Sequence, residues 1–274
     1  MNDLDAVLRT IDDWGAHHAA AAVVGPDGVV ARYGAADHRY RWASVTKLAT
    51  ALAVLSAVDD GLIDLDELTG PPGSTVRHLL AHASGLPFEG DAILAKPGTR
   101  RIYSNPGFDA LGGLLAERSE RSFPVALSDR VLAPLGMAQT ELVGRPSEGL
   151  DGSLVDAAIL ARELLHPTLL TPKTAEAART VQFPGLKGVL PGVGAFDPLD
   201  WGLGFELRDG KTPHWTGSMN SPATFGHFGG AGTFIWVDPA LDRSLVCLTD
   251  REYGPWALDA WPRFSDGVIK VLRG

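Results

Sequence analysis

The 274-residue sequence has little of what disulfide-rich, membrane-spanning or exported proteins need. It contains one cysteine, Cys247, so no internal disulfide can form. Cys247 lies in the apolar run 244–249, and we expect a buried structural thiol, because a catalytic thiol needs a polar, electropositive setting. No stretch of about 18 apolar residues occurs, and the N-terminus lacks the basic and apolar parts of a secretory signal. We therefore expect a cytoplasmic protein with no membrane partner.

A cationic surface and the common cofactor motifs are also missing. The formal net charge is -9 and the acidic residues are scattered, which argues against a nucleic-acid partner. His78 and His82 have the spacing of zinc ligands, but Leu79 stands where a His-Glu-x-x-His site has its glutamate. Neither a Gly-x-Ser-x-Gly motif nor a phosphate-binding glycine loop occurs. The sequence therefore predicts no metal site and no cofactor.

The chain does show a change of hydrophobic pattern along its length. Helical spacing predicts a helix over residues 3–18, and residues 19–24 and 29–33 are typical of two strands joined by the turn 25–28. A second helix should start at or near Ser44 and run to about Val58. Further helices are expected over 75–82, 106–120, 122–132, 153–166 and 255–272, and further strands over 202–207, 223–226, 232–237 and 244–249.

This order of elements predicts an α+β fold. Strands lie near both ends of the chain and helices lie between them, so the economical arrangement is one antiparallel sheet built from both ends and flanked by the terminal helices. A mostly helical region is then inserted into the sheet domain. We expect residues 1–61 plus 196–274 to form the α/β domain, and residues 62–195 to form the inserted helical domain.

The segment Ser44-Val-Thr-Lys47 places a serine and a lysine three residues apart at the expected start of a helix. Residues at this spacing share a helix face, so the Lys47 amine can reach the Ser44 oxygen. Serine is a weak nucleophile without a nearby base, and burial can lower the pKa of a lysine enough to make it one. The helix N-terminus would also favour an oxyanion. The alternative for so short a pattern is a serine near a helix cap beside an exposed lysine.

Two later segments carry further candidate residues. Tyr103-Ser-Asn105 lies on a loop just before Pro106, a favoured first helical residue; a tyrosine there can share a proton with a lysine, and an asparagine can orient a substrate amide. The alternative is ordinary turn chemistry, since Asn-Pro starts turns. His227-Phe-Gly-Gly230 lies at the edge of the strand cluster, where glycines allow a ligand close to the backbone and a free N–H can bind an oxyanion. The alternative here is a bulge or a tight bend.

Taken together and in this order, the three segments resemble the penicillin-recognising serine hydrolases. That family includes class C β-lactamases, D-alanyl-D-alanine carboxypeptidases, D-aminopeptidases and related esterases, and it shows Ser-x-x-Lys, then Tyr-x-Asn, then Lys/His-x-Gly. Supporting segments also match, including 78–86, 97–99 and 134–137. The resemblance runs from about residue 20 to residue 250 and implies a β-lactamase/transpeptidase-like fold.

The resemblance also implies roles for these residues. Ser44 would attack a carbonyl and form an acyl-enzyme, while Lys47 and Tyr103 would form the proton-shuttling unit; either can be the base, because the two titrate as a coupled pair. Asn105 would hold the substrate amide or the lysine. The backbone N–H groups of Ser44 and Gly230 would form the oxyanion hole. The other residues of the substrate-binding strand would be His227, Phe228 and Gly229.

Departures from the family pattern favour an esterase or amidase acting on small esters or amides. His227 replaces a lysine and Phe228 stands where β-lactamases usually have a hydroxyl, so capture of a substrate carboxylate should be weaker. The missing export signal points the same way, because a cytoplasmic enzyme does not meet peptidoglycan. A β-lactamase or D-amino-acid peptidase is the alternative, with a β-lactam or peptide as substrate. A catalytically idle relative that binds a ligand is a third, and the sequence makes no prediction of oligomeric state.

Overall fold

The computed structural model describes residues 3–274, and its centre is an antiparallel sheet of six strands in the order β2-β1-β12-β11-β10-β9. Strand β1 pairs with β12, so that Ala19 lies opposite Thr249, and both ends of the chain therefore build one sheet, as expected. The strands are β1 (Ala19–Gly25), β2 (Gly28–Gly34), β9 (Glu206–Leu207), β10 (Phe225–Gly229), β11 (Thr233–Asp238) and β12 (Arg243–Thr249).

The central strands are buried on both faces, and their side chains alternate between two cores. On β11, Ile235 and Val237 belong to one hydrophobic cluster, whereas Phe234 and Trp236 belong to the other. This alternation follows from the two-residue period of a strand. Cys247 on β12 lies in the second cluster and is buried, as expected for a structural thiol.

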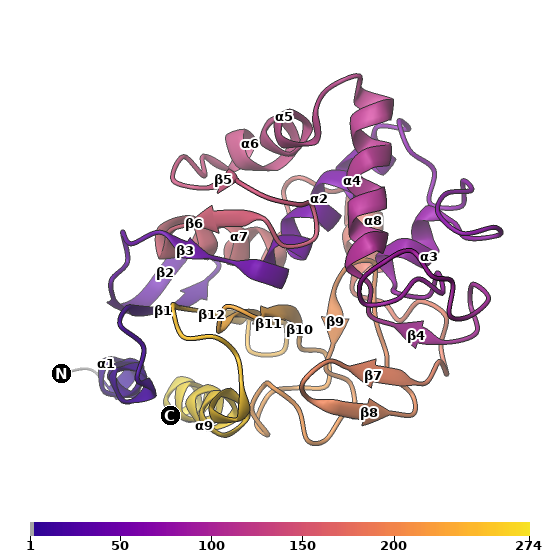
Figure 1. Ribbon diagram of the computed structural model, residues 1–274. Helices are drawn as coiled ribbons and strands as arrows, with labels where there is room; N and C mark the ends of the chain where they lie inside the picture. The colour runs from indigo at the N-terminus through magenta and orange to yellow at the C-terminus, as the bar shows by residue number, and fades with distance from the viewer. Residues whose placement is uncertain (1–2) are drawn as a thin grey trace.

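Helices cover both faces of the sheet (Figure 1). Helix α1 (Asp3–Leu8), a 3-10 turn (Arg9–Trp14) and α9 (Pro255–Arg273) lie on one face, and α7 (Leu154–Leu165) packs on β1 and β12 from the other. The helix expected over 3–18 ends at Trp14, because Gly15 adopts a left-handed conformation with φ 67°. No helix within residues 3–274 has both the length and the apolarity to cross a bilayer.

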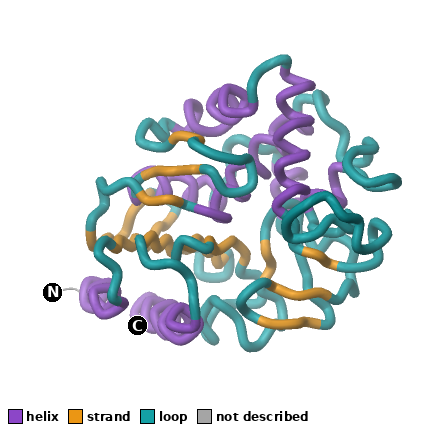
Figure 2. Tube along the Cα trace, viewed as in Figure 1, coloured by secondary structure: helices purple, strands orange, loops and turns teal. Residues whose placement is uncertain are grey.

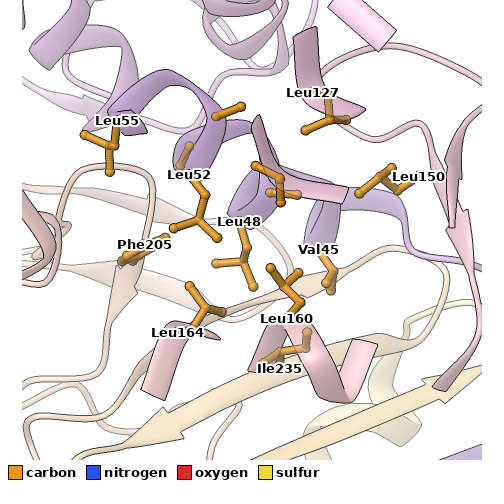
Figure 3. Packing of buried hydrophobic residues seen from close by; sticks show 14 of the residues in the cluster. Val45, Leu48, Leu52, Leu55, Leu127, Leu150, Leu160, Leu164, Phe205 and Ile235 are labelled. Atoms are coloured by element: carbon orange, nitrogen blue, oxygen red, sulfur yellow. The ribbon is translucent and has the colours of Figure 1, made fainter. Parts of the chain in front are cut away.

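Helix α2 (Thr46–Asp59) follows a 3-10 turn (Ala43–Val45) and is buried nearly all round. A helix that is apolar on every side belongs in a core. Figure 3 shows Leu48 of this helix facing Leu160 and Leu164 of α7, with Ile235 of the sheet beside Leu160. The alanines of α2 leave room for close neighbours. Lys47 in its first turn is completely buried, and Ser44 lies just before the helix, in the 3-10 turn.

The region between the two halves of the sheet is helical with many loops (Figure 2). Its helices are α3 (Val76–Leu80), α4 (Asn105–Ser119), α5 (Phe123–Leu127) with a π turn (Ser128–Leu132), α6 (Ala133–Leu135) and α8 (Pro172–Ala178). Two small sheets join it to its surroundings, in the orders β3-β6-β5 and β4-β7-β8. Their strands are β3 (Tyr40–Arg41), β4 (Arg101–Ile102), β5 (Glu141–Leu142), β6 (Leu150–Gly152), β7 (Gly188–Leu190) and β8 (Gly194–Phe196).

Several boundaries differ from the sequence expectation. The strand expected over 202–207 is only Glu206–Leu207, since Gly204 has φ 90° and interrupts the extended backbone. The strand expected over 223–226 begins later and runs to Gly229, so that it includes His227. Helix α8 and the short strands β3 to β8 were not predicted. The division into two domains remains a prediction.

Candidate active site

Ser44 lies in the 3-10 turn that leads into α2, directly after a strained residue. Ala43 has φ 47°, a conformation that L-residues with a side chain rarely adopt. The backbone is held there by Trp42, whose N–H donates to Leu150 O at 2.8 Å and whose indole Nε1 donates to Gly152 O at 3.2 Å. These bonds tie the turn that carries Ser44 to β6 and leave Ser44 half-buried at the pocket surface.

Lys47 is completely buried and its Nζ has three oxygen partners. The distances are 3.2 Å to Ser44 Oγ, 2.6 Å to Asn105 Oδ1 and 2.8 Å to the backbone oxygen of Ser147. Burial lowers the pKa of Lys47 from its usual value to about 7, because the charged amine is removed from water. The exposed-lysine alternative is therefore wrong for this chain, and a neutral amine is available near pH 7.

The partners of Lys47 also decide where the lone pair of that neutral amine points. Asn105 Oδ1 and the Ser147 carbonyl can only accept hydrogen bonds. A neutral amine that donates its two hydrogens to them keeps its lone pair for the third partner, Ser44 Oγ, whose hydroxyl can donate. The arrangement can therefore take a proton from Ser44.

Tyr103 and Asn105 reach the same point from the start of α4. Ser104 caps this helix, because its Oγ accepts the Gly107 N–H at 3.1 Å, and its neighbours on either side face the lysine. Lys47 Nζ lies 4.8 Å from the centre of the Tyr103 ring. Burial raises the pKa of Tyr103 above its usual value, and the Ser44 hydroxyl offsets this only in part. Tyr103 is therefore a protonated phenol beside the serine, and its Oη makes no hydrogen bond of good geometry within residues 3–274.

Gly229 brings strand β10 against the turn that carries Ser44. A Cβ atom at this position would lie 2.4 Å from Trp42 O, 2.5 Å from Thr233 Oγ1 and 3.1 Å from Ala43 Cβ, so only glycine allows this approach. The next residue, Gly230, is exposed and borders the same pocket as Ser44. Neither the Ser44 N–H nor the Gly230 N–H is used in a turn or loop hydrogen bond between described residues, so both can face an oxyanion.

His227 lies on β10 as a buried, neutral imidazole. Its Nδ1 lies 2.7 Å from Phe228 O, which can only accept, so Nδ1 carries the hydrogen and Nε2 has the free lone pair. Burial, and then the charge of Lys47, lower the pKa of His227 to about 3. His227 therefore offers an acceptor and no positive charge at any pH near neutrality.

These residues surround a pocket of about 280 Å³, which lies over Ser44. Its charged lining residues are three glutamates and one arginine: Glu89, Glu148, Glu206 and Arg41. Glu206 is buried and ion-paired with Lys211 at 2.9 Å. Most of the remaining lining is apolar or aromatic, from Phe88, Leu190, Pro191, Trp201, Phe228 and Tyr253.

The Beta-lactamase family profile matches residues 4–266, nearly the whole chain. The chain belongs to the β-lactamase family. Mb2281c of Mycobacterium bovis, described as a β-lactamase, has a crystal structure that matches this family member with a TM-score of 0.95 and 50% sequence identity, over 97% of this chain and 99% of that one. The β-lactamase/transpeptidase-like fold expected from the motifs is thus confirmed.

Other relatives of this β-lactamase-family chain carry different descriptions. Escherichia coli AmpH, a D-alanyl-D-alanine-carboxypeptidase/endopeptidase, is 28% identical over 149 residues, which are 41% of this chain and 39% of AmpH. The chain thus aligns with well under half the length of the curated relatives it matches. EstCE1, a hydrolase with promiscuous acyltransferase activity, has a TM-score of 0.78 at 17% identity over 97% of both chains, which shows the fold alone.

Sequence reasoning missed three residues of this β-lactamase-family site. Ser147 contributes a backbone oxygen, which no side-chain motif can signal. His82, weighed above as a zinc ligand, accepts the Ser104 N–H with Nδ1 at 3.1 Å, and its ring centre lies 4.5 Å from that of Tyr103. Glu89 accepts a hydrogen bond from Asn105 Nδ2 at 2.7 Å. Only His82 had a signal in the sequence, its place in the segment 78–86 that resembles the family.

Proposed function

We propose that this chain is a serine hydrolase that forms an acyl-enzyme at Ser44 and acts on small, uncharged esters or amides. The observation that carries the proposal is the buried Lys47 amine, whose pKa is about 7 and whose lone pair is left for the Ser44 hydroxyl. A lysine has no reason to be buried at such a cost in desolvation unless its neutral form is used.

In the acylation step, Lys47 accepts the Ser44 proton as Oγ attacks the substrate carbonyl. The carbonyl oxygen becomes an oxyanion, which the N–H groups of Ser44 and Gly230 stabilise. Burial favours the neutral form of both Lys47 and Tyr103, so the amine is the better base and the phenol the better acid. Tyr103 then passes a proton to the leaving alcohol or amine and is reprotonated from Lys47.

In the deacylation step, the same groups activate water. A water molecule takes the place of the leaving group and gives its proton to the Lys47–Tyr103 pair as it attacks the acyl carbon. The tetrahedral intermediate again places its oxyanion at Ser44 N and Gly230 N, and its collapse returns the proton to Ser44 Oγ. An alcohol in place of water would give acyl transfer instead of hydrolysis.

The charges of the pocket favour uncharged substrates. Neutral His227 cannot attract a carboxylate, and Phe228 cannot donate a hydrogen bond to one. Glu89 and Glu148 line the pocket with exposed or half-buried carboxylates, while the only cation among the described lining residues is the exposed Arg41. Arg145 is ion-paired with both glutamates, at 2.9 and 2.8 Å, so it is not free to bind a substrate carboxylate.

The second candidate function is hydrolysis of β-lactams, which the 50% identity with the Mycobacterium bovis protein favours. A β-lactam antibiotic also presents a carbonyl to Ser44, within a strained ring, but it carries a carboxylate as well. The two candidate functions therefore share Ser44 as the nucleophile. They differ in whether the pocket accepts a substrate that carries a carboxylate.

The test compares p-nitrophenyl acetate and butyrate with a chromogenic cephalosporin, using the wild type and Ser44→Ala. Ester turnover that disappears in Ser44→Ala, with little cephalosporin cleavage, is the expected result. Rapid cephalosporin cleavage would move the assignment to β-lactamase.

If neither substrate shows Ser44-dependent turnover, intact-mass labelling with a fluorophosphonate distinguishes the remaining cases. Labelling of the wild type alone would indicate a reactive serine with a narrower substrate, such as a particular amide. An unlabelled Ser44 would contradict the proposal and indicate an idle, ligand-binding relative.

A further inference from the structure

We propose that Glu89 is a positioning residue for this reaction, whose carboxylate fixes the Asn105 amide so that Asn105 holds Lys47 and not the substrate. Its role in catalysis rests on the proposed function. None of the three sequence motifs includes Glu89, which lies on the loop after α3, at the edge of the pocket.

The orientation of the Asn105 amide is set by two partners of opposite kind. Lys47 Nζ donates a hydrogen to Oδ1 at 2.6 Å, and it can do so in both its charged and its neutral form. The Glu89 carboxylate can only accept, and its Oε1 lies 2.7 Å from Nδ2. A flipped amide would place N–H groups against an ammonium and a carbonyl against a carboxylate. Glu89 therefore keeps the acceptor end of Asn105 on the lysine.

Glu89 is itself held in place by Arg145. The guanidinium makes two hydrogen bonds to the carboxylate, at 2.9 and 3.1 Å, and this paired geometry fixes the orientation of both groups. Arg145 lies two residues before Ser147, whose carbonyl binds Lys47 at 2.8 Å. The contacts thus close a ring from Lys47 through Asn105, Glu89 and Arg145 back to Lys47. The Asn105 N–H also donates to Phe88 O at 3.1 Å, which binds the loop to the ring at a second point.

Glu89 also contributes charge near the lysine. Burial dominates the lowered pKa of Lys47, and nearby carboxylates oppose it while Arg145 adds to it. The titratable and charged groups that act on or respond to Lys47 are Glu89, Glu148, Asp109, Arg145, His82 and His227, with Tyr103 in ring contact. Removal of one carboxylate from this set should make Lys47 lose its proton at lower pH.

Two substitutions separate the positioning effect from the charge effect. Glu89→Gln keeps a carbonyl that can accept from Asn105 Nδ2 but removes the charge, whereas Glu89→Ala removes both. We expect Glu89→Ala to lower kcat on p-nitrophenyl butyrate about tenfold at high pH. Glu89→Gln should stay within about twofold there. In both variants the acid limb of the kcat/KM profile should move down by about half a pH unit.

Glu117→Gln is the matched control, because it removes an exposed carboxylate from the far end of the same helix that begins at Asn105. It should change neither kcat nor the acid limb. Equal loss of kcat in Glu89→Gln and Glu89→Ala, or an acid limb that does not move, would overturn the proposal. Thermal melting of each variant shows whether the fold is intact.

A measurement without substrate keeps this test separate from the test of the proposed function. The pKa of Lys47 can be followed by NMR of protein labelled with ¹³Cε-lysine, with Lys47→Arg to assign the signal. A lower Lys47 pKa in Glu89→Gln than in the wild type is expected even if no ester is turned over. An unchanged pKa would contradict the inference while leaving the assignment of Ser44 as nucleophile intact.

Discussion

At the scale of single residues, one buried amine connects stability and chemistry. Lys47 has no exposed surface, and its pKa of about 7 lies well below the 10.5 of a free lysine. A base whose pKa is lowered by folding destabilises the folded state wherever the unfolded chain binds its proton more tightly. That penalty is absent well above pH 10.5, grows as the pH falls, and is complete below about pH 7.

This linkage predicts a pH-dependent gain in stability for Lys47→Met, in which the amine is replaced by an apolar side chain of similar length. As the pH falls from 10 to 7, the free energy of unfolding of the variant should rise relative to the wild type by about 3 kcal/mol. Urea unfolding at several pH values measures the difference. A difference that is constant with pH would show that Lys47 does not titrate near 7.

The same pKa predicts the pH dependence of activity. For a neutral ester, kcat/KM should rise as Lys47 loses its proton and level off above about pH 7, because this ratio reports the ionisation of the free enzyme. His227 should contribute nothing between pH 5 and 8, since its pKa is lowered to about 3. A second inflection near pH 6 that disappears in His227→Gln would contradict the neutral, buried imidazole.

At the scale of elements, the site depends on how closely β10 approaches the turn before α2. Gly229, the last residue of β10, and Gly230, which follows it, have different surroundings. Gly229 is buried against Trp42 and Thr233, whereas a Cβ atom at Gly230 would meet no atom within 4 Å. The two positions therefore form a matched pair for testing the approach.

We expect Gly229→Ala to lower the free energy of unfolding by about 2 kcal/mol or more and to reduce kcat/KM by at least about tenfold, because the strand must move away from Ser44. Gly230→Ala should change the free energy of unfolding by less than about 0.5 kcal/mol. Chemical denaturation and ester kinetics of the two variants measure both quantities. Similar destabilisation by both substitutions would mean that the strand is not held against the turn.

The elements that the sequence predicted are those with a strong local signal. The hairpin of β1 and β2 follows from the Gly25–Gly28 turn, and α2, α7 and α9 follow from apolar spacing. The strands β3 to β8 are two or three residues long, and such short pairings depend on tertiary contacts that leave no periodic pattern. The site motifs could be predicted because they are patterns of side-chain types in the sequence. The Ser147 carbonyl and the Glu89 contact could not, because they depend on loop geometry alone.

At the scale of the whole molecule, the two ends of the chain complete each other. Strand β1 is paired on both sides, with β2 and with β12, and α9 covers the face that contains Phe234 and Trp236. Helices α1 and α9, from the two ends of the described chain, also lie side by side in Figure 1. The closing helix is therefore part of the core.

A chain that ends at residue 254 should fail to fold. It would lack the buried side chains of α9, which are Ala257, Trp261, Phe264, Ser265, Val268 and Ile269. Burial of each large apolar side chain contributes about 1.5 to 3 kcal/mol, so their combined loss is comparable to the whole stability of a typical domain. A chain that ends at residue 272 lacks only two exposed residues and should remain soluble and folded. Soluble yield and circular dichroism of the two chains measure the effect, and a folded 254-residue chain would refute it.

The pocket over Ser44 is lined by two sets of residues, one assigned to the chemistry and the other to contact with the substrate. In the proposed mechanism, proton transfer and oxyanion binding depend on Ser44, Lys47, Tyr103 and the turn at Gly230, which are held by the sheet and the central helix. Much of the apolar wall comes from Phe88, the stretch Leu190–Gly192 and Tyr253, on loops and a short strand that carry none of those groups. If the chain is the proposed hydrolase, random mutagenesis confined to these wall segments should therefore change which acyl chains are accepted while the chemistry of the reaction stays the same, which makes this small protein a suitable starting point for selecting new substrate ranges.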